Sequence, residues 1–270
     1  MPLQIQKTHP AEVAGMRKKY LNSLVKFQDV YLEFVIRDSA CYKLSLENQA
    51  IGYAIVSADD VLVEFYIEEK FSKNSPDFFH ALVQQLSIKG VYCKSFDHLL
   101  LNCCLVYSLP HEVIGYLYRD FSDKGLQLKK ALSFRDAEVS DLPFLQQQND
   151  EVFEPKALLK EFVERKGILI LEQGDKIIGC GFLTQVVADY PYYDLGVWVE
   201  PAFRRQGHAV QIMLYMIRLC HNNGWLPVCG CDAANTASQE MLSKIGFIGH
   251  YKLLEFDTAI PEAMMGKQVD

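Results

Sequence analysis

The stretch VEPAFRRQGHAVQIMLYMIRLC, residues 199–220, places a polar turn with two arginines and a glycine between two apolar segments. A helix that begins directly after a strand has about four unpaired peptide N–H groups in its first turn, and the helix dipole adds partial positive charge there. In residues 204–209, Gly207 removes the side chain that would block close approach, and the arginines add charge at the rim. We therefore expect this turn to bind a pyrophosphate.

Two other phosphate-binding motifs do not fit this turn. It is not a P-loop, because no Lys-Ser or Lys-Thr follows the glycine. It is not a dinucleotide fingerprint either, because the G-x-G of the chain, Gly179 to Gly181, falls in an expected hairpin rather than at a strand-to-helix turn. A basic helical turn taken alone is often only solvated surface, so a second motif has to support the interpretation.

The C-terminal half alternates between strand and helix patterns. A strand and then a helix capped by Ser140 come first, followed by a hairpin over 167–185. Further strands are expected at 192–199, 226–232 and 251–257, and helices at 210–223, ending at Gly224, and at 236–245. This order predicts an α/β protein with a mixed sheet covered by helices.

The N-terminal half repeats this order more faintly. A hairpin is expected at 41–56, a strand at 61–67, a helix with a glycine stop at 76–90 and a buried strand at 99–109. Residues 67–71 correspond to residues 199–203, and in each half a turn, a helix, a glycine and a strand ending in aspartate (Asp97, Asp232) follow. The pattern predicts a duplicated fold with a boundary in the polar stretch 123–130.

Composition narrows the class of protein. The 270 residues are 50% apolar and carry a formal net charge of -7, which argues against a nucleic-acid partner. The N-terminal region lacks a signal-peptide core, and the longest apolar run, 99–109, is too short to cross a bilayer. The eight cysteines lack the C-x-x-C spacing of common zinc sites. We expect a cytoplasmic protein with reduced thiols, no metal and no membrane partner.

Two motifs together identify a family resemblance. Val199-x-Pro201-x-x-Arg204-x-x-Gly207-x-Ala209 resembles the acyl-CoA signature of the GNAT superfamily of N-acetyltransferases. Downstream, Asn235-x-x-Ser238 followed by Lys244-Ile245-Gly246-Phe247 resembles the segment that ends the same domain. The resemblance implies a GNAT-like acyl-CoA N-acyltransferase fold in two tandem lobes, a degenerate N-terminal domain at 1–130 and an N-acetyltransferase domain at 131–270.

The resemblance also implies binding roles for particular residues. Backbone groups of the strand at 195–199, Val197, Trp198 and Val199 among them, would pair with the pantetheine amides and polarise the thioester carbonyl. The pyrophosphate site would comprise Arg204, Arg205, Gln206, Gly207, His208, Ala209 and Val210. Asn235 would bond the pantetheine arm with Ser238 beside it, although Asn235 is equally suited to cap the helix that follows. The matching N-terminal turn has Ser75 and Pro76 at this place, so we expect no CoA there.

The acid and the base of the reaction are less sharply marked. Asp194, on the strand that would carry the acyl group, is a candidate base, and Asp232 is a rival; either could instead be a solvated strand end or loop residue. Many family members have a tyrosine acid where this chain has Leu242, so Tyr251 is a candidate substitute, although a tyrosine on a half-buried strand is more often packing. Tyr190, Tyr192 and Tyr193 are further possible substitutes.

These motifs predict an acetyl-CoA-dependent N-acetyltransferase. The donor would be acetyl-CoA and the acceptor a primary amine of a small molecule or peptide, which attacks the thioester directly. An alternative is a non-catalytic acyl-CoA-binding or sensing module, and a third reading is a structural tandem domain without CoA. The chain would act as a monomer or homodimer.

Overall fold

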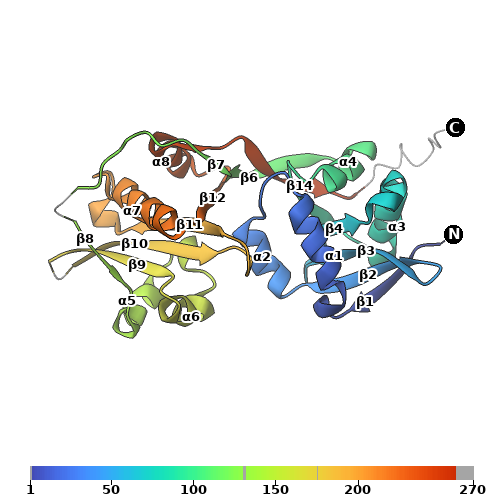
Figure 1. The fold of residues 1–270 in the computed structure, drawn as a ribbon, viewed down its shortest axis with the longest axis horizontal. Coiled ribbons are helices and arrows are strands. Elements are labelled where there is room, and N and C mark those ends of the chain that lie inside the picture. The colour runs from blue at the N-terminus through green and yellow to red at the C-terminus, as the bar shows by residue number, and fades with distance from the viewer. Residues whose placement is uncertain (1, 130–131, 175, 260–270) are drawn as a thin grey trace. The chain divides into compact units, whose positions relative to one another are not determined.

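The computed structural model describes residues 2–129, 132–174 and 176–259 (Figure 1). By packing, these residues form two compact units. Unit 1 comprises residues 2–116, 232–234 and 251–259, and unit 2 comprises the described residues of 117–231 and 235–250. The predicted domains, 1–130 and 131–270, follow chain order, whereas unit 1 also includes a strand from near the C-terminal end. The boundary at residue 130 stays a prediction.

Unit 1 is built on a mixed sheet in the order β1-β2-β3-β4-β5-β14-β6. Neighbouring strands from β1 to β4 are antiparallel, β4 and β5 are parallel, and β14 is antiparallel to β5. Its strands are β1 (Gln4–Thr8), β2 (Ala40–Leu46), β3 (Gln49–Val56), β4 (Val61–Ile67), β5 (Gly90–Lys94), β14 (Tyr251–Asp257) and β6 (His111–Tyr118), whose residues up to Tyr116 belong to this unit.

Helices cover both faces of β4. Successive strand residues point to opposite faces, so Glu64 faces α1, where Arg17 lies, while Phe65 packs on Phe79 of α3. The helices of the unit are α1 (Pro10–Ser23), α2 (Val30–Arg37), η1 (Glu69–Asn74), α3 (Ser75–Leu86) and α4 (His98–Val106). Leu254 and Phe256 of β14 complete the apolar core on the α3 and α4 side.

Unit 2 has a second mixed sheet, in the order β12-β11-β10-β9-β8. β11 and β12 are parallel, and the other neighbours are antiparallel. The strands are β8 (Ser133–Asp136), β9 (Ile168–Gln173), β10 (Lys176–Gln185), β11 (Tyr192–Val199) and β12 (Leu226–Asp232), with a separate pair, β7 (Asp120–Phe121) and β13 (Phe247–Ile248).

The long helix α7 lies against β10 and β11. A Cβ on Gly181 would come within 2.7 Å of Met216 Sδ and 2.8 Å of Ile212 Cγ2, so the glycine lets α7 approach β10 closely. The other face of the sheet holds a core in which Trp198 packs on Phe144 and Phe153. The helices of unit 2 are η2 (Val139–Asp141), α5 (Leu142–Gln147), η3 (Glu151–Phe153), η4 (Lys156–Leu158), α6 (Leu159–Glu164), η5 (Pro201–Phe203), α7 (His208–Asn223) and α8 (Thr236–Ile245).

Three local predictions are wrong. The apolar run 99–109, expected as a strand, forms most of α4, because Asp97 caps a helix there by accepting a hydrogen bond from the N–H of Leu100. Helix α3 ends at Ser87 in a left-handed conformation rather than at Gly90. The expected Ser140 cap is instead a capping box between Glu138 and Asp141. The strand expected to end at Asp97 is β5, which ends at Lys94, and α7 starts two residues earlier than expected, at His208. The other expected strands and helices are confirmed.

In the described residues, no helix is long and apolar enough to cross a bilayer. The same part of the chain contains no group of three or more His, Cys, Asp or Glu side chains that could hold a metal ion. All eight cysteines are free thiols, and all but Cys231 are buried.

Candidate active site

The strand β11 presents an unpaired backbone edge. Its ladder with β12 runs from Tyr192 opposite Leu226 to Asp194 opposite Val228 and ends there. The N–H of Glu200 donates to Ile178 of β10, and the N–H of Val186 donates to Tyr192, so the even-numbered residues of β11 pair with β10. The odd-numbered Val197 therefore directs its N–H and C=O away from β10, and neither group has a partner among the described residues.

The three residues of β11 that are predicted to bind pantetheine, Val197, Trp198 and Val199, differ in whether their peptide groups are free to bind a ligand. The peptide groups of Val197 are available to a ligand that adds to this edge. Those of Trp198 bond to β10, and its side chain is buried in the core. The carbonyl of Val199 accepts a hydrogen bond from Arg204 Nε at 2.9 Å. The unpaired backbone edge is thus shorter than the stretch 195–199 that is predicted to bind the pantetheine amides.

The turn after β11 collects free N–H groups. After η5, Arg205 and Gly207 both have left-handed backbones, with φ of 64° and 84°. No peptide N–H from residues 205–210 has an acceptor in the described part of the chain, while Gln211 N–H already donates to Gly207 C=O. A non-glycine residue in this conformation costs on the order of 1 kcal/mol, and alternating right- and left-handed residues form concave anion-binding nests.

The space around Gly207 bears on whether a phosphate can approach the turn. It is the N-terminal cap of α7 and makes no side-chain cap, so the helix start is not closed by the protein itself. A Cβ built on it would meet no described atom within 4 Å, so the space in front of the turn is open. The positive φ accounts for the glycine there and internal packing does not, and the open space leaves room for a ligand.

Arg204 holds the turn in place. Besides its bond to Val199, its Nη2 lies 3.5 Å from Asp150 Oδ2 in a half-exposed ion pair. Arg205 and Gln206 are exposed, and Gln206 Nε2 donates to Ala202 C=O at 3.5 Å. Of the two arginines predicted to contact phosphate, Arg204 is therefore committed to the protein, whereas Arg205 remains exposed at the rim.

His208 opens α7 and is half-buried. Its ring packs edge-on against Phe203. Burial and, next, the charge of Lys129 lower the pKa of His208 from its usual 6.5, so the ring is mostly neutral at pH 7. Ala209 and Val210 follow in the first turn and add no charge.

Asn235 is the N-cap of α8, which is the helix-capping role that the sequence allows beside pantetheine binding. Its Oδ1 accepts a hydrogen bond from the N–H of Ser238 at 3.0 Å. Its amide nitrogen donates to no acceptor in the part of the chain that the structure describes, so it remains available as a donor. Leu242, at the position of the usual tyrosine, is buried within α8.

Asp194 is the last residue of β11 that pairs with β12. It lies opposite Thr184 on β10 and is half-buried. Its side chain shares the face of Trp198, because residues four apart on a strand point the same way. Asp194 thus lies three residues before Val197, whose peptide groups form the open edge of β11.

The other two candidate residues lie in unit 1. Asp232 ends β12 and is exposed, and its Oδ1 accepts a short hydrogen bond of 2.6 Å from Ala234 N–H, which forms a local turn. Tyr251 begins β14, packs edge-on against Phe96 and lies 5.8 Å from Lys26 Nζ. The turn at Asp232 agrees with its alternative interpretation as a loop residue, and the contact with Phe96 agrees with that of Tyr251 as a packing residue.

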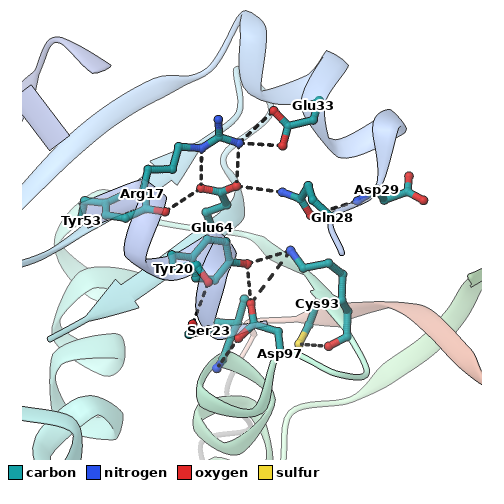
Figure 2. Close-up of polar contacts among 12 residues, drawn as sticks. Arg17, Tyr20, Ser23, Gln28, Asp29, Glu33, Tyr53, Glu64, Cys93 and Asp97 are labelled. Carbon is teal, nitrogen blue, oxygen red and sulfur yellow. Dashed lines mark hydrogen bonds and ion pairs between the residues drawn. The ribbon is translucent and has the colours of Figure 1, made fainter. Parts of the chain in front are cut away.

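Unit 1 also has a parallel ladder that ends early, between β4 and β5. Side chains of unit 1 fill the space beyond the end of that ladder. The β4–β5 ladder ends after Leu62 opposite Val91. Beyond it, buried Glu64 accepts hydrogen bonds from Arg17, Gln28 and Tyr53 (Figure 2). The hydroxyl of Tyr20 from α1 donates to Asp97 Oδ2 at 2.6 Å and accepts from Lys94 Nζ at 2.8 Å.

This second cluster corresponds to the Asn235 site of unit 2. Asp97 caps α4 as Asn235 caps α8, each through the N–H three residues on. The sequence comparison had matched Asp97 with Asp232 instead. Asp97 and Lys94 are almost fully buried, and Tyr20 bonds to both, so side chains of unit 1 fill the place that corresponds to Asn235.

Gln211 lies one helical turn after Gly207 and is not among the residues that the sequence motifs predict for the site. It is buried on α7, and its Oε1 accepts a hydrogen bond from the Lys129 N–H at 2.8 Å. Its sequence signal is that a polar residue stands within the apolar stripe of α7. The sequence does not reveal its partner, because Lys129 lies in the polar stretch 123–130, where the pattern predicts a domain boundary.

Sequence profiles of two acetyltransferase families match the chain. The profile described as "Acetyltransferase (GNAT) domain" matches residues 9–121, and that described as "Acetyltransferase (GNAT) family" matches residues 132–247. No curated protein sequence matches.

Solved structures share the fold at low identity. An acetyltransferase of the GNAT family from Colwellia psychrerythraea superposes with a TM-score of 0.84 at 19% identity, over 95% of this chain and 99% of its own. A GCN5-related N-acetyltransferase from Sphaerobacter thermophilus gives 0.58 at 12% identity over 94% and 95%. A tandem GNAT protein from the clavulanic acid biosynthesis pathway gives 0.63 at 8% identity over 94% and 98%.

The two profile matches lie one after the other, and each falls on a half that has its own sheet and its own strand-turn-helix order. The chain therefore belongs to the GNAT acetyltransferases, which transfer acyl groups from acyl-CoA, and it has two GNAT domains in tandem.

Proposed function

We propose that the second domain, 131–270, is an acetyl-CoA-dependent N-acetyltransferase that acts on a primary amine of a small molecule or peptide. The observation that carries this is the continuity of two open backbone surfaces in one stretch of chain. The free edge at Val197 leads within a few residues to the free N–H groups of 205–210. An acyl-CoA presents its thioester and its pantetheine amides first and its pyrophosphate further along, in the same linear order.

Acetyl-CoA supplies an acyl group activated as a thioester. Transfer forms a bond between the amine nitrogen and the acyl carbon and breaks the carbon–sulfur bond, so that CoA leaves as a thiol. The amine must first lose its ammonium proton to a base, and the leaving sulfur must gain a proton. The protein's part is to position both reactants and to handle these protons.

We assign the base role to Asp194. Its support is its location, at the last β11–β12 pair and next to the free edge that would orient the acyl group. Asp232 is a weaker candidate because its carboxylate already closes a local turn. Tyr251 remains a proposed proton donor, although the Phe96 contact accounts for its ring without one.

The alternative is a non-catalytic module that binds or senses acyl-CoA. It needs the same turn and the same edge, but no base. We further propose a cytoplasmic protein that works as a monomer or homodimer.

Ligand binding is the first test. Isothermal titration with acetyl-CoA should show saturable binding, and Gly207→Glu should abolish it by filling the space before the turn with a negative group. Gly224→Glu is the matched control, because Gly224 is a left-handed glycine (φ 71°) at the other end of α7. If the unaltered protein binds no acetyl-CoA, both the transferase and the sensor are excluded.

Turnover separates the two remaining functions. In a screen of amines, Asp194→Asn should lower kcat by about 100- to 10,000-fold, as expected for loss of a general base, and leave the affinity for CoA unchanged. Asp189→Asn makes the same chemical change in the exposed turn before β11 and should have no effect. Equal turnover of the two variants would remove Asp194 from the mechanism, and absence of turnover with every amine would favour the sensor.

A further inference from the structure

Residues 120–129, here called the connecting segment, are bound along unit 2 rather than free. Its start forms β7, which pairs with β13 after α8. The N–H of Ser122 then donates to Gly246 C=O at 2.8 Å. In Figure 1 the segment continues from β7 past α8 toward α7. A polar stretch between two domains would ordinarily be a tether, but this one follows a fixed path.

Gln211 holds the far end of the connecting segment. Its Oε1 accepts from Lys129 N–H at 2.8 Å, and its Nε2 donates to Gln127 C=O at 3.4 Å. Arg218, two turns further along α7, donates to Gln127 Oε1 at 3.3 Å. Gln211 is only 7% exposed, so both groups of its side chain need these partners. The main chain of Lys129 is therefore bound to the side chain of a residue that lies one helical turn after Gly207.

This position supplies a cation at the first turn of α7. Arg204 is engaged by Val199 and Asp150, and the His208 ring is mostly neutral. Lys129 is exposed, and its charge is near enough to lower the pKa of His208. An exposed ammonium beside unpaired N–H groups is suited to a phosphate oxygen.

We propose that Lys129, held by Gln211, is a further ligand-binding residue of the acyl-CoA site and contacts a phosphate group of CoA. The inference rests on the proposed function of the α7 turn and adds the connecting segment to that site. Lys129 is the ligand-contacting residue, and Gln211 is a positioning residue. The phosphate is either the pyrophosphate or the 3'-phosphate.

Titration calorimetry of the full chain tests this with CoA and with dephospho-CoA, which lacks the 3'-phosphate. Lys129→Ala should weaken CoA binding by about 3- to 10-fold, the scale of one exposed charge-assisted contact, and Lys129→Arg should retain most of the affinity. Lys124→Ala is the matched control, because it removes the same charge from the same segment five residues earlier.

The two ligands identify which phosphate is bound. An equal loss for CoA and dephospho-CoA supports a contact to the pyrophosphate, and a loss for CoA alone supports a contact to the 3'-phosphate. If the unaltered protein binds CoA and Lys129→Ala binds it equally well, the inference fails and the α7 turn stands. If the unaltered protein binds no CoA, the proposed function fails as well.

Gln211→Met tests the positioning role, because it keeps the volume of the side chain and removes both hydrogen bonds to the segment. It should weaken CoA binding in the unaltered background and have little further effect in Lys129→Ala. Independent effects of the two changes would contradict the coupling. NMR titration of the ligand-free protein adds a check of place, since Lys129→Ala should raise the pKa of His208, and an unchanged pKa would place the ammonium elsewhere.

Discussion

At the scale of single residues, glycines with positive φ decide which segments can come together. Gly246, in the Lys-Ile-Gly-Phe motif, ends α8 in a left-handed conformation with φ of 114°. A Cβ on it would overlap the carbonyl oxygen of Ser122 in the connecting segment. The glycine therefore serves both the helix end and the close approach of β7.

Gly246→Ala should lower the free energy of unfolding by about 2 to 4 kcal/mol, because it combines backbone strain with overlap against a main-chain atom. Gly224→Ala is the comparison, since Gly224 ends α7 with a similar positive φ but has open space around its Cβ, and it should cost only about 1 kcal/mol. Urea unfolding measures both. Equal losses would show that the connecting segment does not press on Gly246.

At the scale of elements, the parting of β11 from β12 leaves an open backbone edge at the proposed site. A fully paired parallel ladder would bury every peptide group of β11. Here the ladder ends at Asp194, while β10 continues to pair with β11 as far as Val199. One edge of the strand is thus fixed by β10, and the other is left for a ligand.

Amide hydrogen exchange should show this alternation. In the ligand-free protein, the amide of Val197 should exchange faster than those of Gly196 and Trp198, which bond to β10. Acetyl-CoA should slow Val197 and leave its neighbours nearly unchanged. Similar rates for all three amides, with or without ligand, would contradict a free edge on β11.

At the scale of the whole molecule, two domains of one family have different interiors. The parting of β4 from β5 in unit 1 is followed by the buried cluster of Glu64 with Arg17, and by Tyr20 with Asp97 and Lys94. Burial raises the pKa of Asp97 and that of Tyr20. Displacing these paired groups with a ligand would leave buried charges without partners, which is costly.

The chain should therefore bind about one molecule of acetyl-CoA, because the buried cluster of unit 1 resists displacement. The stoichiometry of the calorimetric titration measures this directly, and Gly207→Glu should remove all binding rather than half of it. A stoichiometry near two, with half retained in Gly207→Glu, would show that unit 1 also accepts the ligand.

Sequence by itself determined the local features of this protein. The turn at 204–209, the helix stop at Gly224 and the cap at Asn235 depend on residues a few positions apart, so composition and spacing reveal them. The duplicated order of strands and helices was visible for the same reason. The run 99–109 misled because its apolar residues suit a buried strand or a buried helix equally, and the Asp97 cap decided between them.

Only the tertiary structure decided which distant residues meet. The pairing of Gln211 with Lys129, of Gly246 with Ser122, and of Tyr20 with Asp97 joins positions tens of residues apart. The addition of β14 to the sheet of unit 1 is likewise absent from any local pattern. Such contacts depend on how the sheets pair and how the helices pack on them, and a side chain's own neighbours in the sequence do not specify either.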